Sequence, residues 1–351
     1  MPVIEHFRQQ IQASAAAGTA LRLRGGGSKD WYGQRIEGDI LDTRAYSGIV
    51  AYEPTELVVT ARCGTALAEL EAALAQHGQM LAFEPPHFGS AATVGGAVSC
   101  GLSGPRRASS GAVRDFVLGA VLLDGRGERL RFGGQVMKNV AGYDVSRLLA
   151  GSMGSLGLIL DYSIKVLPRP QAQASVRLAM SEIDAIDKLN AWAGQPLPIS
   201  ASCWHAGQLT LRLSGAGAAV AAAARTLGGE ALADDAPFWA GLREHQHPFF
   251  AGATSLWRLS LPSSAAALVV KGEQLIEWGG AQRWLKAELD AEGARRLRAA
   301  VGALGGHATL FRGGDKSVGV FTPLPPALAR IHQRLKTVFD PAHIFNPGRL
   351  F

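Results

Sequence analysis

Three consecutive glycines near the N-terminus have the composition of an anion-binding loop. Residues 25–27 are all glycine and follow a short stretch of alternating apolar and basic residues. Without a Cβ, successive backbone N–H groups can converge on a phosphate. Arg24 and Lys29 flank the segment with positive charge, and Ser28 adds a hydroxyl donor. On its own, a triple glycine is also compatible with a flexible turn.

A second stretch of small residues, 92–104, repeats this chemistry further along the chain. It combines glycines with serine, threonine and alanine, and no charged side chain interrupts it. Two such loops could hold one pyrophosphate from both sides. Neither matches the Walker A motif, which ends in Gly-Lys-Ser/Thr, or the Rossmann fingerprint. The closest Rossmann-like stretch, 209–217, lacks the third glycine and is typical of a plain strand, turn and helix.

Two further features have simpler explanations. A third glycine cluster at 151–157 lies where a helix is predicted to end and a buried strand to begin, so packing alone could account for it. His245 and His247 lie on a predicted loop without an accompanying set of cysteine or carboxylate ligands. We therefore expect these histidines to be solvated, and we predict no metal site.

The elements that would position these loops alternate along the first half of the chain. The hydrophobic pattern predicts strands at 20–24, 57–61 and 158–166, a helix at 65–77, and a hairpin of 116–123 with 129–132. Prolines at 168 and 170 then indicate a domain boundary. The second half predicts strands at 174–180, 208–213, 256–261 and 282–285 and helices at 181–192 and 218–227. Leu328, Ile331, Leu335 and Val338 recur at helical spacing in the C-terminal tail.

Length and composition fit a globular protein of about two domains. Of the 351 residues, 47% are hydrophobic and 18% are charged. The 43 glycines make up about 12% of the chain, whereas the usual share of glycine is about 7%. The net charge of +6 comes from scattered basic residues, so nucleic-acid binding is not indicated. Cys63, Cys100 and Cys203 have no CxxC spacing, which favours reduced thiols over disulfides or an iron–sulfur site.

No targeting or membrane segment is predicted. Residues 1–12 carry charges and lack the apolar core of a signal peptide. The long uncharged runs at 85–105 and 189–211 are interrupted by proline and polar residues, so neither is a membrane-spanning helix. We expect a soluble chain without a transmembrane segment.

Several motifs of the chain, taken in order, resemble those of a known family. The two glycine stretches, residues 138–144, the Gly-Ser-x-Gly-x-Leu-Gly stretch at 151–157 and the Asn-Pro-Gly-Arg ending at 346–349 follow the order of the vanillyl-alcohol-oxidase-type (PCMH-type) FAD flavoproteins. Within that superfamily the chain resembles, essentially end to end, the FAD-binding E subunits of bacterial glycolate oxidase. Segments that support the narrower match are 84–87, 104–107, 130–134 and 278–284.

The resemblance implies an α+β fold and FAD as the cofactor. The expected regions are a two-subdomain PCMH-type FAD-binding domain at 1–170, a smaller α+β cap domain at 171–306, and a segment at 307–351 that returns to the flavin. Both glycine loops would hold the pyrophosphate, and the chain ending would approach the isoalloxazine. The implied FAD-binding residues are Arg24, Gly25, Gly26, Gly27, Ser28, Lys29, Pro85, Thr93, Val94, Gly95, Gly96, Ser99, Gly101, Gly104, Gly157, Ile159, Asn346 and Arg349.

Catalytic residues are less clearly marked than cofactor residues. The related D-subunits and D-lactate dehydrogenases carry His-x-Gly-Asp-Gly-Asn-x-His and Gly-Glu-His-Gly stretches, and this chain has neither. Oxidation of a 2-hydroxy acid needs a base for the hydroxyl proton and cations for the carboxylate. His307 is the candidate base, and Arg258 could bind the carboxylate. A structural or partner-facing role for His307 also remains open.

The resemblance further implies partners and a location. Electrons from glycolate, which becomes glyoxylate, would pass to a separate iron–sulfur subunit, and a D-type subunit would carry a second FAD. The chain would be cytoplasmic, and its partners could bring it to the inner membrane. It could oxidise glycolate itself, serve as a non-catalytic flavin relay or assembly subunit, or act alone on another small 2-hydroxy acid. His87 and Cys100 lie near the second glycine loop, but no feature requires a covalent flavin, so we expect non-covalent binding.

Overall fold

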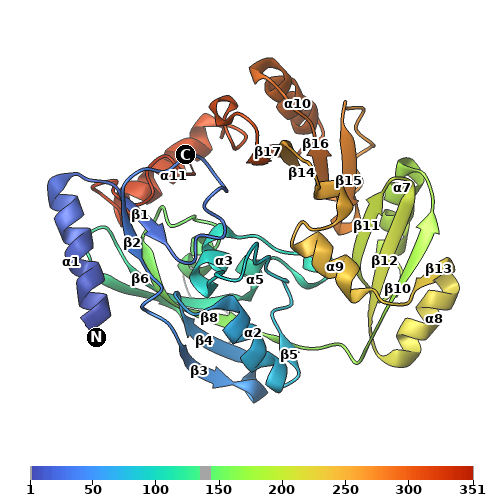
Figure 1. The fold of residues 1–351 in the computed structure, drawn as a ribbon, viewed down its shortest axis with the longest axis horizontal. Coiled ribbons are helices and arrows are strands. Elements are labelled where there is room, and N and C mark those ends of the chain that lie inside the picture. The colour runs from blue at the N-terminus through green and yellow to red at the C-terminus, as the bar shows by residue number, and fades with distance from the viewer. Residues whose placement is uncertain (1, 135–143, 351) are drawn as a thin grey trace. The chain divides into compact units, whose positions relative to one another are not determined.

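The computed structural model describes residues 2–134 and 144–350, which form two compact units (Figure 1). The first unit comprises Met1–Ser103, Gly111–Arg169 and Pro323–Phe351, and the second comprises Gly104–Ser110 and Pro170–Thr322. Residues 307–322, grouped above with the C-terminal segment, belong to the second unit because β17 (His307–Gly313) pairs there with β14 (Ser255–Ser260). The motif at 138–144 lies outside the described residues, apart from Asp144.

An antiparallel five-stranded sheet forms the centre of the first unit, in the order β3-β4-β8-β6-β7. Its strands are β3 (Ile49–Glu53), β4 (Val58–Arg62), β6 (Val117–Leu123), β7 (Arg129–Gly133) and β8 (Leu158–Lys165). Two short pairs accompany it: parallel β1 (Leu21–Arg24) with β2 (Asp39–Asp42), and antiparallel β5 (Gln79–Met80) with β9 (Leu167–Pro168). The helical segments are α1 (Pro2–Ala17), η1 (Pro54–Glu56), α2 (Leu67–Gln76), α3 (Val94–Cys100), α5 (Val113–Phe116), α6 (Val145–Leu149) and α11 (Pro326–Phe339).

Both faces of this sheet are buried, which explains why its central strands are almost continuously apolar. Along β6, Ala120 and Leu122 pack in the core that contains the apolar residues of α2 and α3. The alternate residues Val121 and Leu123 pack in a second core, with residues of α1, β1 and β2. Because successive side chains of a strand point to opposite faces, one strand serves both cores. The sheet therefore holds the glycine segment after β1 and the helix α3 within one rigid unit.

The second unit is built on an antiparallel eight-stranded sheet, in the order β13-β10-β12-β11-β15-β16-β14-β17. The other strands are β10 (Ala172–Ala179), β11 (Ile199–His205), β12 (Gln208–Gly215), β13 (Glu230–Leu232), β15 (Glu273–Glu277) and β16 (Gln282–Lys286). Its helical segments are α4 (Arg107–Ser110), α7 (Glu182–Ala193), α8 (Gly217–Leu227), α9 (Ala236–Arg243), η2 (Pro248–Phe250), η3 (Trp278–Gly280), α10 (Ala291–Ala303) and η4 (Lys316–Val318). Residues of α10 pack on β14, β16 and β17, and residues of α7 pack on β10 and β12.

Most of the strands and helices predicted from hydrophobic spacing are confirmed, including α2, the β6–β7 hairpin, α7 and α8. Helix α1 was not predicted, although Phe7 and Ile11 have the four-residue spacing of a buried helical face. Strand β11, within the uncharged run at 189–211, was not predicted either, because alternating polar residues obscure the buried strand. The second glycine stretch was expected to be a loop, but its residues from Val94 onward form α3.

Candidate cofactor-binding site

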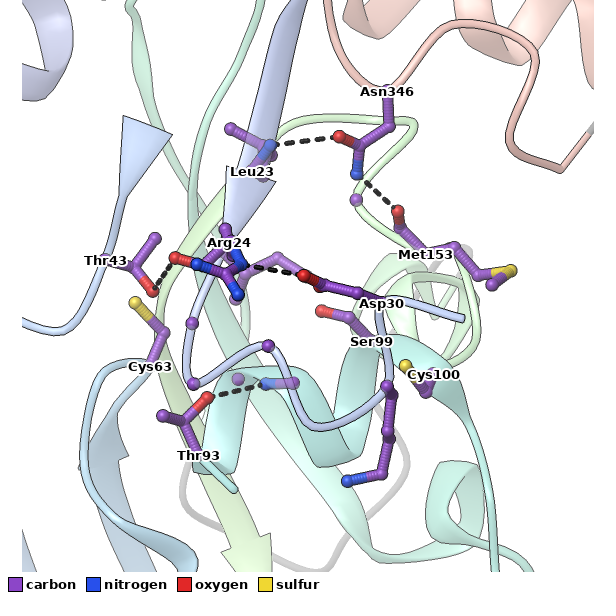
Figure 2. Close-up of a pocket in the computed structure, with 18 of the residues that line it drawn as sticks. Leu23, Arg24, Asp30, Thr43, Cys63, Thr93, Ser99, Cys100, Met153 and Asn346 are labelled. Atoms are coloured by element: carbon purple, nitrogen blue, oxygen red, sulfur yellow. Dashed lines mark hydrogen bonds and ion pairs between the residues drawn. The ribbon is translucent and has the colours of Figure 1, made fainter. Parts of the chain in front are cut away.

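A pocket in the first unit gathers most of the residues predicted to bind the cofactor (Figure 2). It contains about 720 Å³ that no protein atom occupies, partly open to solvent. The predicted residues that line it are Arg24, Gly25, Gly26, Gly27, Ser28, Lys29, Thr93, Gly95, Gly96, Ser99, Gly157, Ile159, Asn346 and Arg349. Segments separated by more than 300 positions in sequence therefore meet in one cavity.

The triple glycine is required by close backbone approach. A Cβ on Gly26 would lie 1.4 Å from the carbonyl oxygen of Ala91, and one on Gly25 would lie 2.4 Å from Oγ1 of Thr93. Gly27 has a φ of 73°, in the left-handed region that disfavours residues with a Cβ. All three positions therefore need glycine, and the alternative of an unconstrained flexible turn does not describe this segment.

The same segment leaves hydrogen-bond donors available at the pocket. Among the residues that the structure describes, the backbone N–H groups of Gly25, Gly26 and Gly27 make no hydrogen bond. Unpaired N–H groups in a tight glycine turn attract anionic oxygen atoms. The donor set and the bare backbone fit the pyrophosphate of FAD, which would lie along this segment.

Charged side chains next to the glycines hold the segment in place. The Asp30 carboxylate accepts from Arg24 Nε at 2.8 Å and from Arg22 Nη2 at 2.5 Å. Lys29 is 6% exposed, and its ammonium donates to the carbonyl of His87 at 3.1 Å. The glycine turn is thus enclosed by a network whose cations outnumber its one carboxylate, and this excess favours an anionic ligand.

Helix α3 supplies the opposite wall of the pocket. Thr93 caps the helix, because its Oγ1 accepts from the N–H of Gly96 at 3.2 Å. A Cβ on Gly95 would lie 2.7 Å from Cβ of Cys63 on the neighbouring segment, so glycine allows α3 to pack against it. The two predicted loops therefore do face one cavity, but the second is a short helix with its N-terminal residues in the lining.

The side chains of the C-terminal residues Asn346 and Arg349 form hydrogen bonds with backbone groups of the protein. Asn346 is 3% exposed and joins two segments: its Oδ1 accepts from Leu23 N–H at 2.9 Å, and its Nδ2 donates to Met153 O at 2.7 Å (Figure 2). Arg349 Nη2 donates to the carbonyls of Lys29 at 3.1 Å and Tyr32 at 2.9 Å. Both side chains line the pocket, but their hydrogen bonds show that they position β1 and the residues after the glycine turn.

The third glycine cluster contributes to the pocket and to packing. Gly154 and Gly157 both line the cavity. Gly157 has a φ of 148°, and a Cβ there would lie 2.7 Å from the carbonyl oxygen of Leu123. Gly154 has a φ of 71°, and its Cβ would lie 2.7 Å from Nδ2 of Asn346. Gly154 and Gly157 therefore both allow close packing and line the pocket.

Five predicted residues lie elsewhere. Pro85 is buried and does not line the pocket, and Val94 belongs to the apolar core of the first unit. Gly101 ends α3 with a φ of 67° and packs against Gly151. Gly104 belongs to the second unit, where its carbonyl accepts from Trp278 Nε1 at 3.0 Å. His307, at the start of β17, is also in the second unit and is exposed.

Several lining residues were not predicted, among them Asp30, Thr43 and Cys63. Thr43 Oγ1 donates to Arg24 O at 3.3 Å, which ties the strand β2 to the start of the glycine turn. Burial raises the pKa of both lining thiols, that of Cys63 to about 12 and that of Cys100 in the same direction. Protonated thiols are poor nucleophiles, so these two do not favour covalent attachment of a flavin. Of these residues, only Asp30 could have been suspected from the sequence, because it lies two residues after Ser28.

His245 differs from the solvated residue that the sequence suggested. Its ring stacks on Phe250 with centroids 4.0 Å apart and meets Trp284 edge-on at 4.7 Å. Burial, followed by the charges of Arg312 and Arg258, holds the pKa of His245 well below its ordinary value. The neutral imidazole is part of an aromatic cluster. Across residues 2–134 and 144–350, no group of three His, Cys, Asp or Glu side chains is placed to hold a metal ion.

Comparisons with known proteins identify the family. A model of the FAD binding domain matches residues 4–133. Glycolate oxidase subunit GlcE of Escherichia coli K12 is 50% identical over 343 residues, which are 98% of this chain and 96% of that protein. The chain belongs to the GlcE family. Glycolate oxidase subunit GlcD of Bacillus subtilis 168 is 35% identical over 105 residues, which cover 29% of this chain and 22% of that protein.

The fold of this GlcE-family chain is also found among solved structures. The structure of alkyldihydroxyacetonephosphate synthase aligns with 98% of this chain and with 75% of its own length. The TM-score is 0.69 and the sequence identity is 14%. At that identity the likeness concerns the fold alone. The predicted family, the α+β fold with a PCMH-type FAD-binding domain, and FAD as the cofactor are confirmed. In the part of the chain that the structure describes, no helix is long and apolar enough to cross a membrane.

Proposed function

We propose that this chain is the FAD-binding subunit of a glycolate oxidase complex, in which it takes part in the oxidation of glycolate to glyoxylate. The identity to a glycolate oxidase subunit, 50% over nearly the whole chain, carries the proposal. It is supported by the pocket, which the triple glycine lines with N–H groups that make no hydrogen bond within the described residues. FAD-linked oxidoreductases of this family use the flavin for the redox step, while the protein binds and orients it.

Oxidation of glycolate removes two electrons and two protons from the C–OH group. FAD, when bound, supplies the two-electron acceptor. The chain's own residues would hold its pyrophosphate along Gly25, Gly26 and Gly27, with Arg24 and Lys29 nearby to offset the negative charge. Asn346 and Arg349 would keep β1 and the glycine turn in register through the backbone hydrogen bonds described above.

A separate iron–sulfur subunit fits the cysteines of this chain. A cluster takes four thiolate ligands, and the sequence has only Cys63, Cys100 and Cys203. Cys203 lies in the second unit, and burial raises its pKa well above the ordinary value. We therefore assign onward electron transfer to an iron–sulfur partner and a second FAD to a D-type subunit. We also place the chain in the cytoplasm, where these partners could bring it to the inner membrane.

A second candidate function, a flavin relay or assembly subunit without substrate chemistry, is favoured by the lining of the pocket. Among the described residues that line it, none is a histidine, and the one carboxylate, Asp30, is engaged by two arginines. His307 remains the proposed base for the case in which this chain oxidises glycolate itself. It is exposed and lies opposite Ser260 in the β14–β17 pairing.

The variant His307→Ala separates the two candidates. A general base contributes roughly 10²–10⁴-fold to a rate. In the complex reconstituted with the D-type and iron–sulfur subunits, we expect glycolate turnover within about twofold of wild type, because His307 is not among the residues that line the pocket. His6→Ala, which changes an exposed histidine on α1, is the matched control. A loss of about 100-fold or more with His307→Ala alone would instead assign the base to this chain.

A further inference from the structure

Helix α11 exposes a stripe of aliphatic side chains. Leu328, Ile331 and Val338 are 40%, 54% and 64% exposed, and Leu335 lies between them, partly buried. Their spacing of three, four and three residues places all four on one face of the helix. We call these four residues the α11 stripe. A row of this kind on one helix differs from single exposed apolar residues, which are common on protein surfaces.

The helix stays attached to its unit without Leu328, Ile331 and Val338. Lys336 and Phe339, on the adjacent face, are 6% and 8% exposed, and Phe339 packs in the main core. The Lys336 ammonium donates to Ser155 O and Phe345 O, both at 2.7 Å. Lys336, Phe339 and the partly buried Leu335 therefore anchor the helix, while Leu328, Ile331 and Val338 remain at the surface.

The charged residues of α11 are all of one sign. Residues 326–339 contain Arg330, Arg334 and Lys336 and no acidic residue. Arg330 and Arg334 are exposed, whereas Lys336 is buried against Asp340. On a helical projection, both arginines fall along the edge of the stripe that faces away from the buried side. The surface therefore presents apolar residues bordered by positive charge.

We propose that the α11 stripe is the docking surface for an amphipathic helix of another subunit of the complex, one whose apolar residues are bordered by Asp or Glu. Apolar side chains at this spacing match the way a helix packs on a helix. Acidic residues on the partner would pair with Arg330 and Arg334. This inference rests on the proposed function, because it requires that the chain be a subunit of a complex.

Two other occupants fit the surface less well. A second copy of α11 would bring exposed arginines against exposed arginines, and like charges disfavour that pairing. A membrane surface would suit the positive charge, but the α11 stripe has no Trp, Tyr or Phe, and its member Leu335 packs against the core. The charge and shape of the surface therefore favour a helix from a different subunit.

The test compares Ile331→Glu with Ile183→Glu. Both residues are helical isoleucines, 54% and 62% exposed, and Ile183 lies on α7 in the second unit. Each full-length variant is co-expressed with the D-type and iron–sulfur subunits, and assembly is measured by affinity capture and sedimentation of the purified complex. We expect Ile331→Glu to weaken assembly at least about tenfold, as for a central interface residue, and Ile183→Glu to leave it unchanged. Arg330→Glu combined with Arg334→Glu should weaken assembly and reduce its dependence on salt.

Each other result overturns the inference. If Ile331→Glu assembles as well as wild type, the docking surface lies elsewhere, while the proposed function stands. If the isolated wild-type chain forms dimers that Ile331→Glu abolishes, the occupant is a second copy. If binding to vesicles of phosphatidylglycerol and phosphatidylethanolamine is lost while assembly persists, the occupant is a membrane. If wild type itself fails to assemble with the two subunits, the proposed function fails together with the inference. Flavin content, measured in parallel, should be equal in wild type and both variants.

Discussion

Replacing Gly26 with alanine is expected to leave the chain largely without FAD. The new Cβ would lie 1.4 Å from Ala91 O, so the glycine turn would have to move away from the backbone segment that precedes α3. Overpacking of this kind costs about 1–3 kcal/mol or more. A loss of about 3 kcal/mol in binding corresponds to an affinity on the order of 100-fold lower. The flavin-to-protein ratio of the purified variant, and its dissociation constant for added FAD, measure the effect.

The control for Gly26→Ala is Gly217→Ala at the start of α8. There the added methyl group meets nothing within 4 Å, and alanine suits a helix better than glycine. We expect wild-type flavin content for this variant. Circular dichroism of Gly26→Ala then distinguishes loss of the site from loss of the fold. A folded Gly26→Ala protein with one FAD per chain would contradict the assignment of the triple glycine to the pyrophosphate.

Replacing Lys336 with methionine is expected to destabilise the first unit strongly. Lys336 Nζ lies 2.6 Å from Oδ2 of Asp340, which is fully buried. Removing one partner of a buried ion pair leaves the other charge unpaired and costs about 3–5 kcal/mol. For a chain of this size that corresponds to a fall in Tm of roughly 6 °C or more.

The same substitution should weaken FAD binding indirectly. Lys336 also donates to the carbonyl of Phe345, next to Asn346, whose side chain joins Leu23 to Met153 at the pocket. Loss of this anchor loosens the segment that fixes the pocket wall. Lys188→Met, an exposed lysine on α7, serves as the control and should change stability by no more than about 0.5 kcal/mol. An unchanged Tm and FAD affinity in Lys336→Met would show that the C-terminal segment does not support the site.

Local sequence marked Gly25, Gly26 and Gly27 as a candidate anion-binding segment, because adjacent residues supply its chemistry, but it left a flexible turn as an alternative. The contacts that require glycine, with Ala91 and Thr93, come from a distant segment and could not be predicted from spacing. The role of Asn346 could not be derived in this way. It depends on a parallel bridge between Leu21 and Phe345 that brings the end of the chain beside β1, and only the family resemblance pointed to it.

Other features depended on packing that spacing alone does not specify. The spacing of Leu328, Ile331, Leu335 and Val338 predicts α11, but it does not determine which face of the helix is buried. In the structure the buried face is centred nearer to Lys336, because this side chain satisfies Asp340 and two backbone carbonyls. Similarly, Cys63 and Thr43 carry no local signal, because they reach the pocket only through the pairing of strands and turns around it.

If this chain itself binds FAD in the glycine pocket, the chain purified alone should contain the flavin. The visible spectrum is recorded, the protein is denatured, and the released cofactor is identified by chromatography. We predict FAD at about one per chain, released without proteolysis because binding is non-covalent. A chain that is folded yet retains no flavin, and does not take up added FAD, would contradict the account.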